Sequence, residues 1–144
     1  MKILVTGGSG FLASHISDKL ISSGHEIYIY DKKISKFKNR KQRFIKGDLS
    51  NTKLLEKIIK KIDVVYHFAA IADIGEAMQN PADTVKTNIL STVNLLNLSL
   101  KDNIKRFIFG STIYVNSEEG SFYKSSKRAA ENYIEEYSKL FSSF

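Results

Sequence analysis

The stretch "ILVTGGSGFLASHI" constrains the fold most, because it places a glycine-rich turn directly between an apolar run and an amphipathic segment. Gly7, Gly10 and Ala13 follow a GxxGxxA spacing. Gly7 can adopt a tight turn, Gly10 allows a pyrophosphate to approach the main chain, and Ala13 allows close helix packing. The pattern predicts a strand, a turn and a helix, with the N–H groups of Gly10, Phe11 and Leu12 facing phosphates. The alternative is a turn that binds nothing.

Strands and helices alternate along the rest of the chain. The runs "HEIYIYD", "QRFIKGD", "DVVYHFAA" and "KRFIFGS" are rich in β-branched or aromatic residues and are predicted to be strands. Helical spacing is found in residues 11–23, 52–61 and 82–100, and again from Tyr123 onward. We therefore predict an α/β fold, a Rossmann-type doubly wound parallel sheet of about five strands with helices on both faces.

Two of these helices carry apolar stripes at helical spacing. The stripe of residues 82–100 contains Val85, Ile89, Val93, Leu96 and Leu100, and the stripe of the last helix contains Ala130, Tyr133, Ile134, Tyr137 and Leu140.

Composition narrows the class of protein. The 144 residues suit one domain, and 42% hydrophobic with 26% charged residues is ordinary for a globular protein. No apolar stretch reaches the length of a membrane span and no leader-like segment precedes the first glycine turn, so we expect a cytoplasmic protein without a membrane partner. There is no Cys, and the three His residues lack ligand-like spacing, so no metal is expected.

Asp31 ends the second predicted strand, a little over twenty residues after Gly7, where a carboxylate can accept the adenosine ribose hydroxyls and repel a 2′-phosphate. NAD is therefore favoured over NADP as cofactor. Lys32 and Lys33 weaken this preference, because either can turn toward a 2′-phosphate. They begin a run of eight Lys or Arg residues between Asp31 and Asp48, and the net charge is +7. The run lacks a nucleic-acid-binding signature, so no nucleic-acid partner is expected.

A second chemical signal lies near the end of the chain. Tyr123 and Lys127 form a YxxxK pair, and residues four apart share a helical face, so the ammonium can lie beneath the phenol. Positive charge stabilises a phenolate. The phenolate can take a proton from a substrate hydroxyl while the carbon that bears this hydroxyl gives a hydride to the cofactor. Thr112 is the candidate to hold that oxygen, with Ser111 as a weaker one. Alone, such a pair is usually two solvated helix residues.

The order of these motifs resembles one family. "TGGSGFLASHI", "GDLS", "YHFAAIADIGEAMQNP", "TNILSTVNLL", "FIFGST" and "YKSSKRAAE" are similar to successive motifs of the extended short-chain dehydrogenase/reductase family, the NAD-dependent sugar epimerase/dehydratase group. The resemblance implies that cofactor-binding residues include Asp48 and Leu49 at adenine and Phe68, Ala69 and Ala70 after the fourth strand. It also implies that Asn88 supports the site from the helix behind, and that Tyr123 and Lys127 bind the cofactor as well as taking part in catalysis. His67 is interpreted as structural.

The resemblance also implies an activity. Family members oxidise a carbon of a nucleotide sugar with bound NAD, rearrange the ketone and reduce it again. They are commonly about twice this length, so residues 1–144 are expected to form the NAD(P)-binding Rossmann domain, with the C-terminal substrate domain absent. The alternative is a non-catalytic NAD-binding module or an inactive fragment. A homodimer is left open, because Tyr133 and Tyr137 can form an interface or pack on the sheet.

Overall fold

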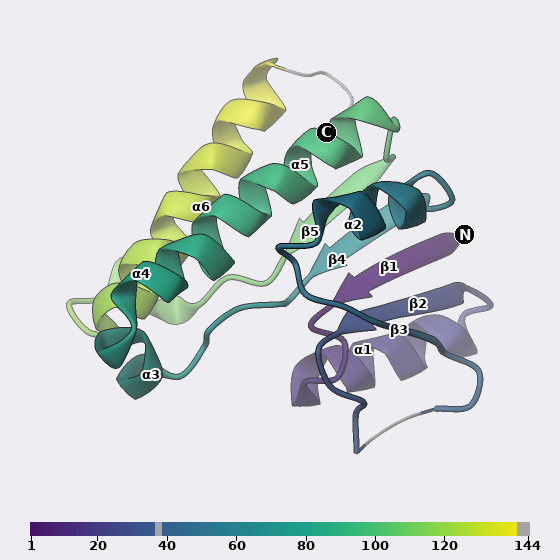
Figure 1. Ribbon diagram of the computed structural model, residues 1–144, viewed down its shortest axis with the longest axis horizontal. Coiled ribbons are helices and arrows are strands. Elements are labelled where there is room, and N and C mark those ends of the chain that lie inside the picture. The colour runs from purple at the N-terminus through teal and green to yellow at the C-terminus, as the bar shows by residue number, and fades with distance from the viewer. Residues whose placement is uncertain (37–38, 141–144) are drawn as a thin grey trace.

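The computed structural model describes residues 1–36 and 39–140 and contains one parallel sheet. The strands are β1 (Lys2–Thr6), β2 (Glu26–Asp31), β3 (Arg43–Lys46), β4 (Val64–His67) and β5 (Arg106–Phe109). Their order is β3-β2-β1-β4-β5, and every neighbouring pair is parallel (Figure 1). The predicted Rossmann-type fold is confirmed.

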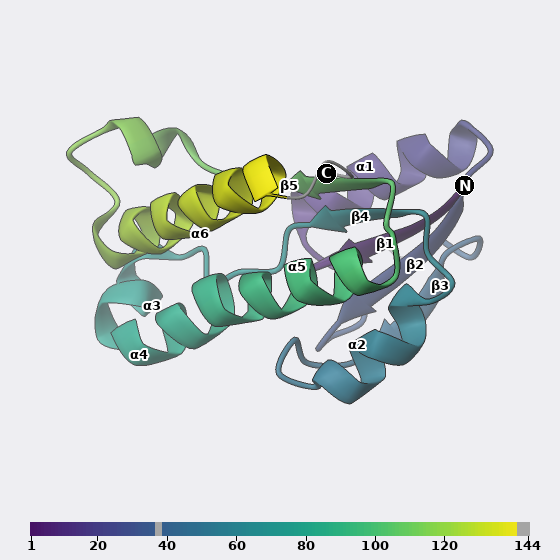
Figure 2. The same cartoon turned by 90° about the horizontal axis from the view of Figure 1, so that it is seen from above.

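Helices cover both faces of the sheet and connect its successive strands, apart from β2 and β3, between which no helix lies within the described residues. They are α1 (Phe11–Ser22), α2 (Thr52–Ile59), α3 (Ile74–Gln79), α4 (Pro81–Thr84), α5 (Ser91–Lys101) and α6 (Ser121–Leu140). A π-helical stretch (Val85–Leu90) joins α4 to α5, and a 3₁₀ turn (Ile113–Asn116) follows β5. Helix α1 packs on one face, whereas α2 and α5 pack on the other, and α6 lies beside α5 (Figure 2). None of the helices within the described residues is long and apolar enough to span a membrane.

Alternating strand residues build two separate cores. On β1, Ile3 and Val5 contribute to the cluster beneath α1, while Leu4 contributes to the cluster beneath α2 and α5. All three are at most 1% exposed. Because successive side chains of a strand point to opposite faces, a strand that is apolar at every position must be covered on both sides.

The buried faces of the later helices differ from the predicted stripes. In residues 84–99 the most buried positions include Asn88, Thr92, Leu95 and Leu96, so Leu96 was assigned correctly, but Val85 is 51% exposed. The π-helical stretch shifts the side-chain register, and small polar residues fill the contact with α6.

On α6, the buried residues are Ser126, Lys127 and Ala130. Tyr133 and Leu140, two members of the apolar stripe, are 49% and 73% exposed. Helix α6 packs on α5 and on the π-helical stretch rather than across the sheet. This contact covers a narrower strip of the surface of α6 than the five-residue stripe in the sequence.

Candidate functional site

A cavity of about 650 Å³ lies at the carboxyl ends of β1, β2 and β4. Parallel sheets bind ligands at this edge, where the strand order reverses. The lining includes Gly7, Ser9, Gly10, Tyr30, Asp31, Lys32, Lys33, Ile34, Ser35, Lys36, Gly47, Asp48, Leu49, Phe68, Ala69, Ala70, Ile71, Ala72, Glu76 and Thr87. Four loops that are distant in sequence therefore meet in one cavity.

The glycine turn approaches the loop after β4 very closely. Gly7 has φ of +67°, and a Cβ at this position would lie 2.5 Å from the backbone nitrogen of Ala69. Gly10 caps α1, and its N–H donates to the Gly7 carbonyl at 3.0 Å. A Cβ at Gly10 would meet only that carbonyl oxygen, at 3.3 Å, so the space beside the helix start is open to a ligand phosphate.

The carboxylate of Asp31 is oriented by main-chain donors. Its Oδ2 accepts the Ser9 N–H at 3.1 Å, and its Oδ1 accepts the Lys33 N–H at 3.0 Å. The Ser9 hydroxyl donates to the Lys33 carbonyl at 2.5 Å and ties the glycine turn to the loop after β2. Ser9 was not among the predicted site residues, although its place inside "GGSG" was a signal.

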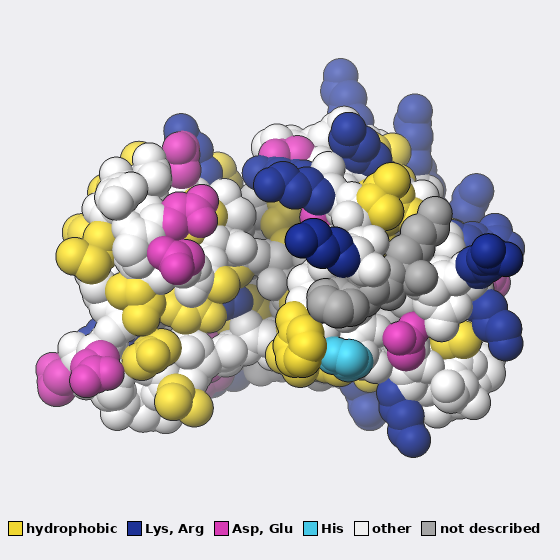
Figure 3. Space-filling view, turned by 90° about the horizontal axis from the view of Figure 1, so that it is seen from below, with side chains coloured by type: hydrophobic (Ala, Val, Ile, Leu, Met, Phe, Trp, Pro, Cys, Tyr) yellow, Lys and Arg dark blue, Asp and Glu magenta, His cyan; other side chains and the backbone are white. Residues whose placement is uncertain are grey.

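Basic residues surround the same cavity. Lys32, Lys33 and Lys36 all line it. Figure 3 shows Lys and Arg side chains gathered on one half of the face beside a central hollow, with several Asp and Glu side chains on the other half. The positive electrostatic potential of these side chains attracts an anionic ligand. Salt screens this attraction and so reduces the distance over which it acts.

Tyr123, Lys127 and Thr112 lie at the start of α6 and after β5, outside the cavity lining. The Lys127 ammonium donates to the Gly110 carbonyl at 2.6 Å and lies 4.4 Å from the centroid of the Phe109 ring. The Lys127 ammonium therefore contacts the end of β5 and the loop that follows it.

Burial sets the proton affinities of this pair. Desolvation raises the pKa of Tyr123, and a hydrogen bond with Thr112 opposes the rise. Desolvation also lowers the pKa of Lys127 to about 8, which the Glu131 carboxylate partly counteracts. Glu131 accepts a hydrogen bond from Ser111. Burial thus favours the neutral phenol at Tyr123.

Asn88 joins the loop after β4 to helix α6. It is 1% exposed, and its Oδ1 accepts the Ile71 N–H at 2.8 Å. Its Nδ2 donates to the Ile71 carbonyl at 3.0 Å and to the Ser126 hydroxyl at 2.9 Å. Ser126 in turn donates to the Tyr123 carbonyl at 2.8 Å. This network holds the start of α6 against the cavity wall. Ser126 was not among the predicted site residues, although it shares a helical face with Tyr123.

His67 extends the network into the sheet. The Thr92 hydroxyl donates to the Asn88 carbonyl at 2.7 Å, so its oxygen accepts from His67 Nε2, 2.9 Å away. His67 Nδ1 then accepts the Thr6 hydroxyl at 2.6 Å. The ring is fully buried, and desolvation lowers the pKa of His67 to about 3. The histidine is therefore neutral, with one tautomer assigned by its partners.

We expect the substitution His67→Gln to weaken the acid sensitivity of the fold. The unfolded chain binds a proton at His67 near pH 6.5, whereas the folded chain does so only near pH 3. Folded stability from this group is thus complete above pH 6.5 and is lost as the pH falls toward 3. As the pH is lowered between these two values, the free energy of unfolding should fall less steeply in the variant than in the unsubstituted protein. The difference in slope should be about 1.4 kcal/mol per pH unit.

Urea titrations at several pH values measure this slope, with His15→Gln as the control on the exposed surface of α1. Equal slopes for His67→Gln and the unsubstituted protein would show that His67 does not titrate on unfolding.

The cavity brings together most of the residues predicted to bind a cofactor. These are Gly7, Gly10, Asp31, Lys32, Asp48, Leu49, Phe68, Ala69 and Ala70. Five of the residues predicted to bind the cofactor lie outside its lining, namely Phe11, Leu12, Asn88, Tyr123 and Lys127. Phe11 and Leu12 begin α1 and are 69% and 61% exposed. Asn88 is instead buried behind the cavity wall.

The fold and this cavity define a Rossmann-type nucleotide-binding domain. Residues 3–144 match the family model described as "NAD dependent epimerase/dehydratase family", and the chain belongs to that family. A UDP-glucose 4-epimerase of Klebsiella pneumoniae is 31% identical over 131 residues, which are 83% of this chain and 94% of that sequence.

Two solved structures are similar over nearly the whole chain. The UDP-glucose 4-epimerase of Thermotoga maritima, determined with UDP-glucose, is 31% identical with a TM-score of 0.92, covering 99% of this chain and 52% of that one. The Thermus thermophilus UDP-glucose 4-epimerase, in complex with NAD, is 28% identical with a TM-score of 0.89, covering 99% and 52%. The chain thus spans about half the length of these enzymes, and also of a Methanocaldococcus jannaschii relative, of which it covers 52%.

Proposed function

We propose that this chain is the NAD-binding part of an epimerase- or dehydratase-type oxidoreductase that acts on a nucleotide sugar. The observation that supports it best is the single cavity shared by the glycine turn, Asp31, Asp48 and the loop from Phe68 to Ala70. Its volume of about 650 Å³ suits a small-molecule ligand. The Thermus and Thermotoga enzymes, described with NAD and with UDP-glucose, supply the chemical class of both ligands.

Each part of the cavity has a role in this proposal. The close approach of Gly7 to Ala69 and the open space at Gly10 accommodate the pyrophosphate beside the start of α1. Asp31, oriented by the Ser9 and Lys33 N–H groups, accepts the ribose hydroxyls. The dinucleotide, when bound, supplies a hydride acceptor.

The proton chemistry is assigned to α6 and the loop after β5. Tyr123 takes the proton of the substrate hydroxyl, and Thr112 holds the same oxygen. Lys127 contributes positive charge that stabilises the phenolate, and the Asn88–Ser126 contact fixes the helix that carries both residues. This assignment places the acid–base chemistry on side chains outside the cavity lining.

A second candidate is a module that binds the dinucleotide without turning over a sugar. The observation in its favour is that Thr112, Tyr123 and Lys127 do not line the cavity. Turnover of a UDP-sugar by the full-length protein distinguishes the two, because a module binds NAD and gives no sugar product.

We expect NAD to bind tightly and with little dependence on salt, NADP to bind more weakly, and duplex DNA not to bind at physiological salt. Calorimetric titration of all three at two salt concentrations measures this. DNA binding that falls steeply with salt, without NAD binding, would overturn the proposal.

The variant Gly10→Val makes the test specific for the phosphate position. The backbone of Gly10 has a negative φ of −70°, and a Cβ there would meet only the Gly7 carbonyl oxygen, at 3.3 Å, so folding should be retained after a small shift of that contact. The added side chain fills the space proposed for the pyrophosphate, and NAD affinity should fall at least about tenfold. Unchanged affinity in this folded variant would place the dinucleotide elsewhere.

A further inference from the structure

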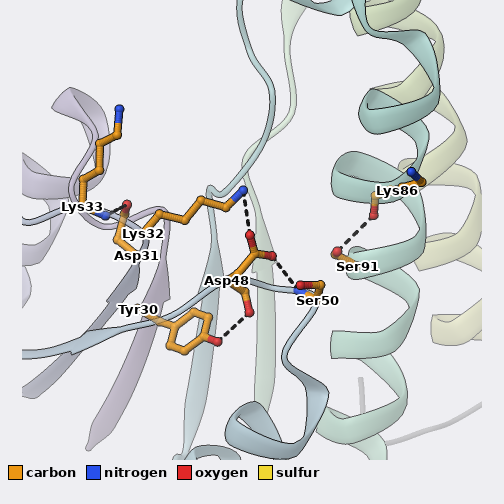
Figure 4. A network of polar contacts seen from close by, with 8 residues as sticks. All are labelled: Tyr30, Asp31, Lys32, Lys33, Asp48, Ser50, Lys86 and Ser91. Atoms are coloured by element: carbon orange, nitrogen blue, oxygen red, sulfur yellow. Dashed lines mark hydrogen bonds and ion pairs between the residues drawn. The ribbon is translucent and has the colours of Figure 1, made fainter.

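Lys32 connects the two loops that border the adenosine end of the cavity. It follows Asp31 directly after β2, and its ammonium lies 2.8 Å from Oδ2 of Asp48, in the loop after β3. Both side chains line the cavity. Figure 4 shows the Lys32 side chain extended across the space between the loops and directed at Asp48.

Hydrogen bonds orient Asp48 for its ion pair with Lys32. Its Oδ1 accepts the Ser50 N–H at 2.8 Å, and its main-chain carbonyl accepts the Tyr30 hydroxyl at 2.7 Å. The hydrogen bond from Lys32 is the largest cause that lowers the pKa of Asp48 to about 2. The carboxylate is therefore ionised at neutral pH, and Lys32 is its ammonium partner.

Asp31 differs from Asp48 in this respect. Both of its carboxylate oxygens accept main-chain N–H groups, and within residues 1–36 and 39–140 no ion pair joins it to a lysine. The Lys33 ammonium points away from Asp31 in Figure 4. A ligand beside Asp31 therefore meets the negative charge of its carboxylate. The ammonium of the adjacent residue, Lys32, is paired with Asp48 instead.

We propose that Asp48 determines cofactor choice by holding the Lys32 ammonium away from the ribose position beside Asp31. The inference rests on the proposed function, because it assigns the ribose of NAD to Asp31. A 2′-phosphate carries close to two negative charges and forms strong bonds with ammonium groups. Adjacent Cα atoms are about 3.8 Å apart, so a released Lys32 side chain reaches the groups that Asp31 contacts. Two carboxylates, rather than Asp31 alone, thus select NAD.

The test compares the dissociation constants of NAD and NADP for four proteins: the unsubstituted chain, Asp48→Asn, Lys32→Met and the double variant. The ratio of the two constants is the readout, because any contact of Asp48 with adenine is common to both dinucleotides and cancels. Asp48→Asn should shift the ratio toward NADP about fivefold, a modest value since Lys32 and Asp48 are 64% and 47% exposed. Lys32→Met alone should change the ratio less than about twofold, and the double variant should lose the shift.

Lys33→Met in the Asp48→Asn background is the matched control. It removes the same charge from the neighbouring residue, and the shift toward NADP should persist. A ratio that stays unchanged in Asp48→Asn overturns the inference, as does a Lys32→Met effect of equal size with and without Asp48. Failure of the unsubstituted chain to bind either dinucleotide overturns the proposed function instead, so the two failures are distinguishable.

Discussion

Replacing Gly7 with Ala is expected to destabilise the fold by about 3 kcal/mol or more and to abolish dinucleotide binding. Gly7 has φ of +67°, which an L-residue adopts only with strain. The added Cβ would lie 2.5 Å from the backbone nitrogen and 2.6 Å from the Cα of Ala69. Backbone atoms cannot rotate away as a flexible side chain can, so β1 and the loop after β4 must separate. Urea denaturation measures the loss.

Gly24→Ala separates the two contributions. Gly24 has a similar φ of +82°, but a Cβ there would meet nothing within 4 Å. It should therefore cost only the backbone strain, about 1 kcal/mol, and leave NAD affinity unchanged. Equal losses of stability at Gly7 and Gly24 would mean that the contact with Ala69 contributes nothing.

Replacing Tyr123 with Phe should lower the rate of hydride transfer by about 10²- to 10⁴-fold while NAD affinity changes less than about twofold. The phenol oxygen is the proposed proton acceptor, and Phe keeps the ring that fills the half-buried position. Because burial raises the pKa of Tyr123, the rate for the unsubstituted protein should also rise with pH as the phenol ionises. Single-turnover formation of NADH with a UDP-sugar and the full-length protein measures both effects.

Tyr133→Phe is the control for this substitution, since Tyr133 lies on the same helix and is 49% exposed. It should leave the rate unchanged. Turnover that survives Tyr123→Phe would remove Tyr123 from the role of base and would leave NAD binding as a separate question.

Local patterns were sufficient to predict the sheet and its connections. The apolar runs that became β1, β2 and β4 are buried on both faces, and only a parallel sheet with helices on each side provides that environment. The turn at Gly7 was also predictable, because its requirement for close backbone approach is visible in the spacing of small residues.

Contacts between distant segments were not predictable from these patterns. Asn88 and Ser126 are separated by 38 residues, and the apolar spacing of either helix does not indicate that their side chains meet. The π-helical stretch changes which residues face inward, and a regular 3.6-residue period misassigns Val85 for that reason. The ion pair of Lys32 with Asp48 likewise depends on how two loops approach each other. Such features arise from tertiary packing, which a helical or strand period does not contain.

The π-helical stretch limits how the length of this segment can change. Its hydrogen bonds include one from the Ser91 N–H to the Lys86 carbonyl, five residues earlier, so it holds one more residue than an α-helix of the same rise. Deleting a single residue there would restore α-helical bonding and keep the two flanks in place, but side chains inside the stretch, which includes Asn88, would change direction. Asn88 would then turn away from Ser126 although both side chains were retained. Alignments or designed chimeras that treat residues 81–101 as one uniform helix would therefore misplace this contact without altering either residue.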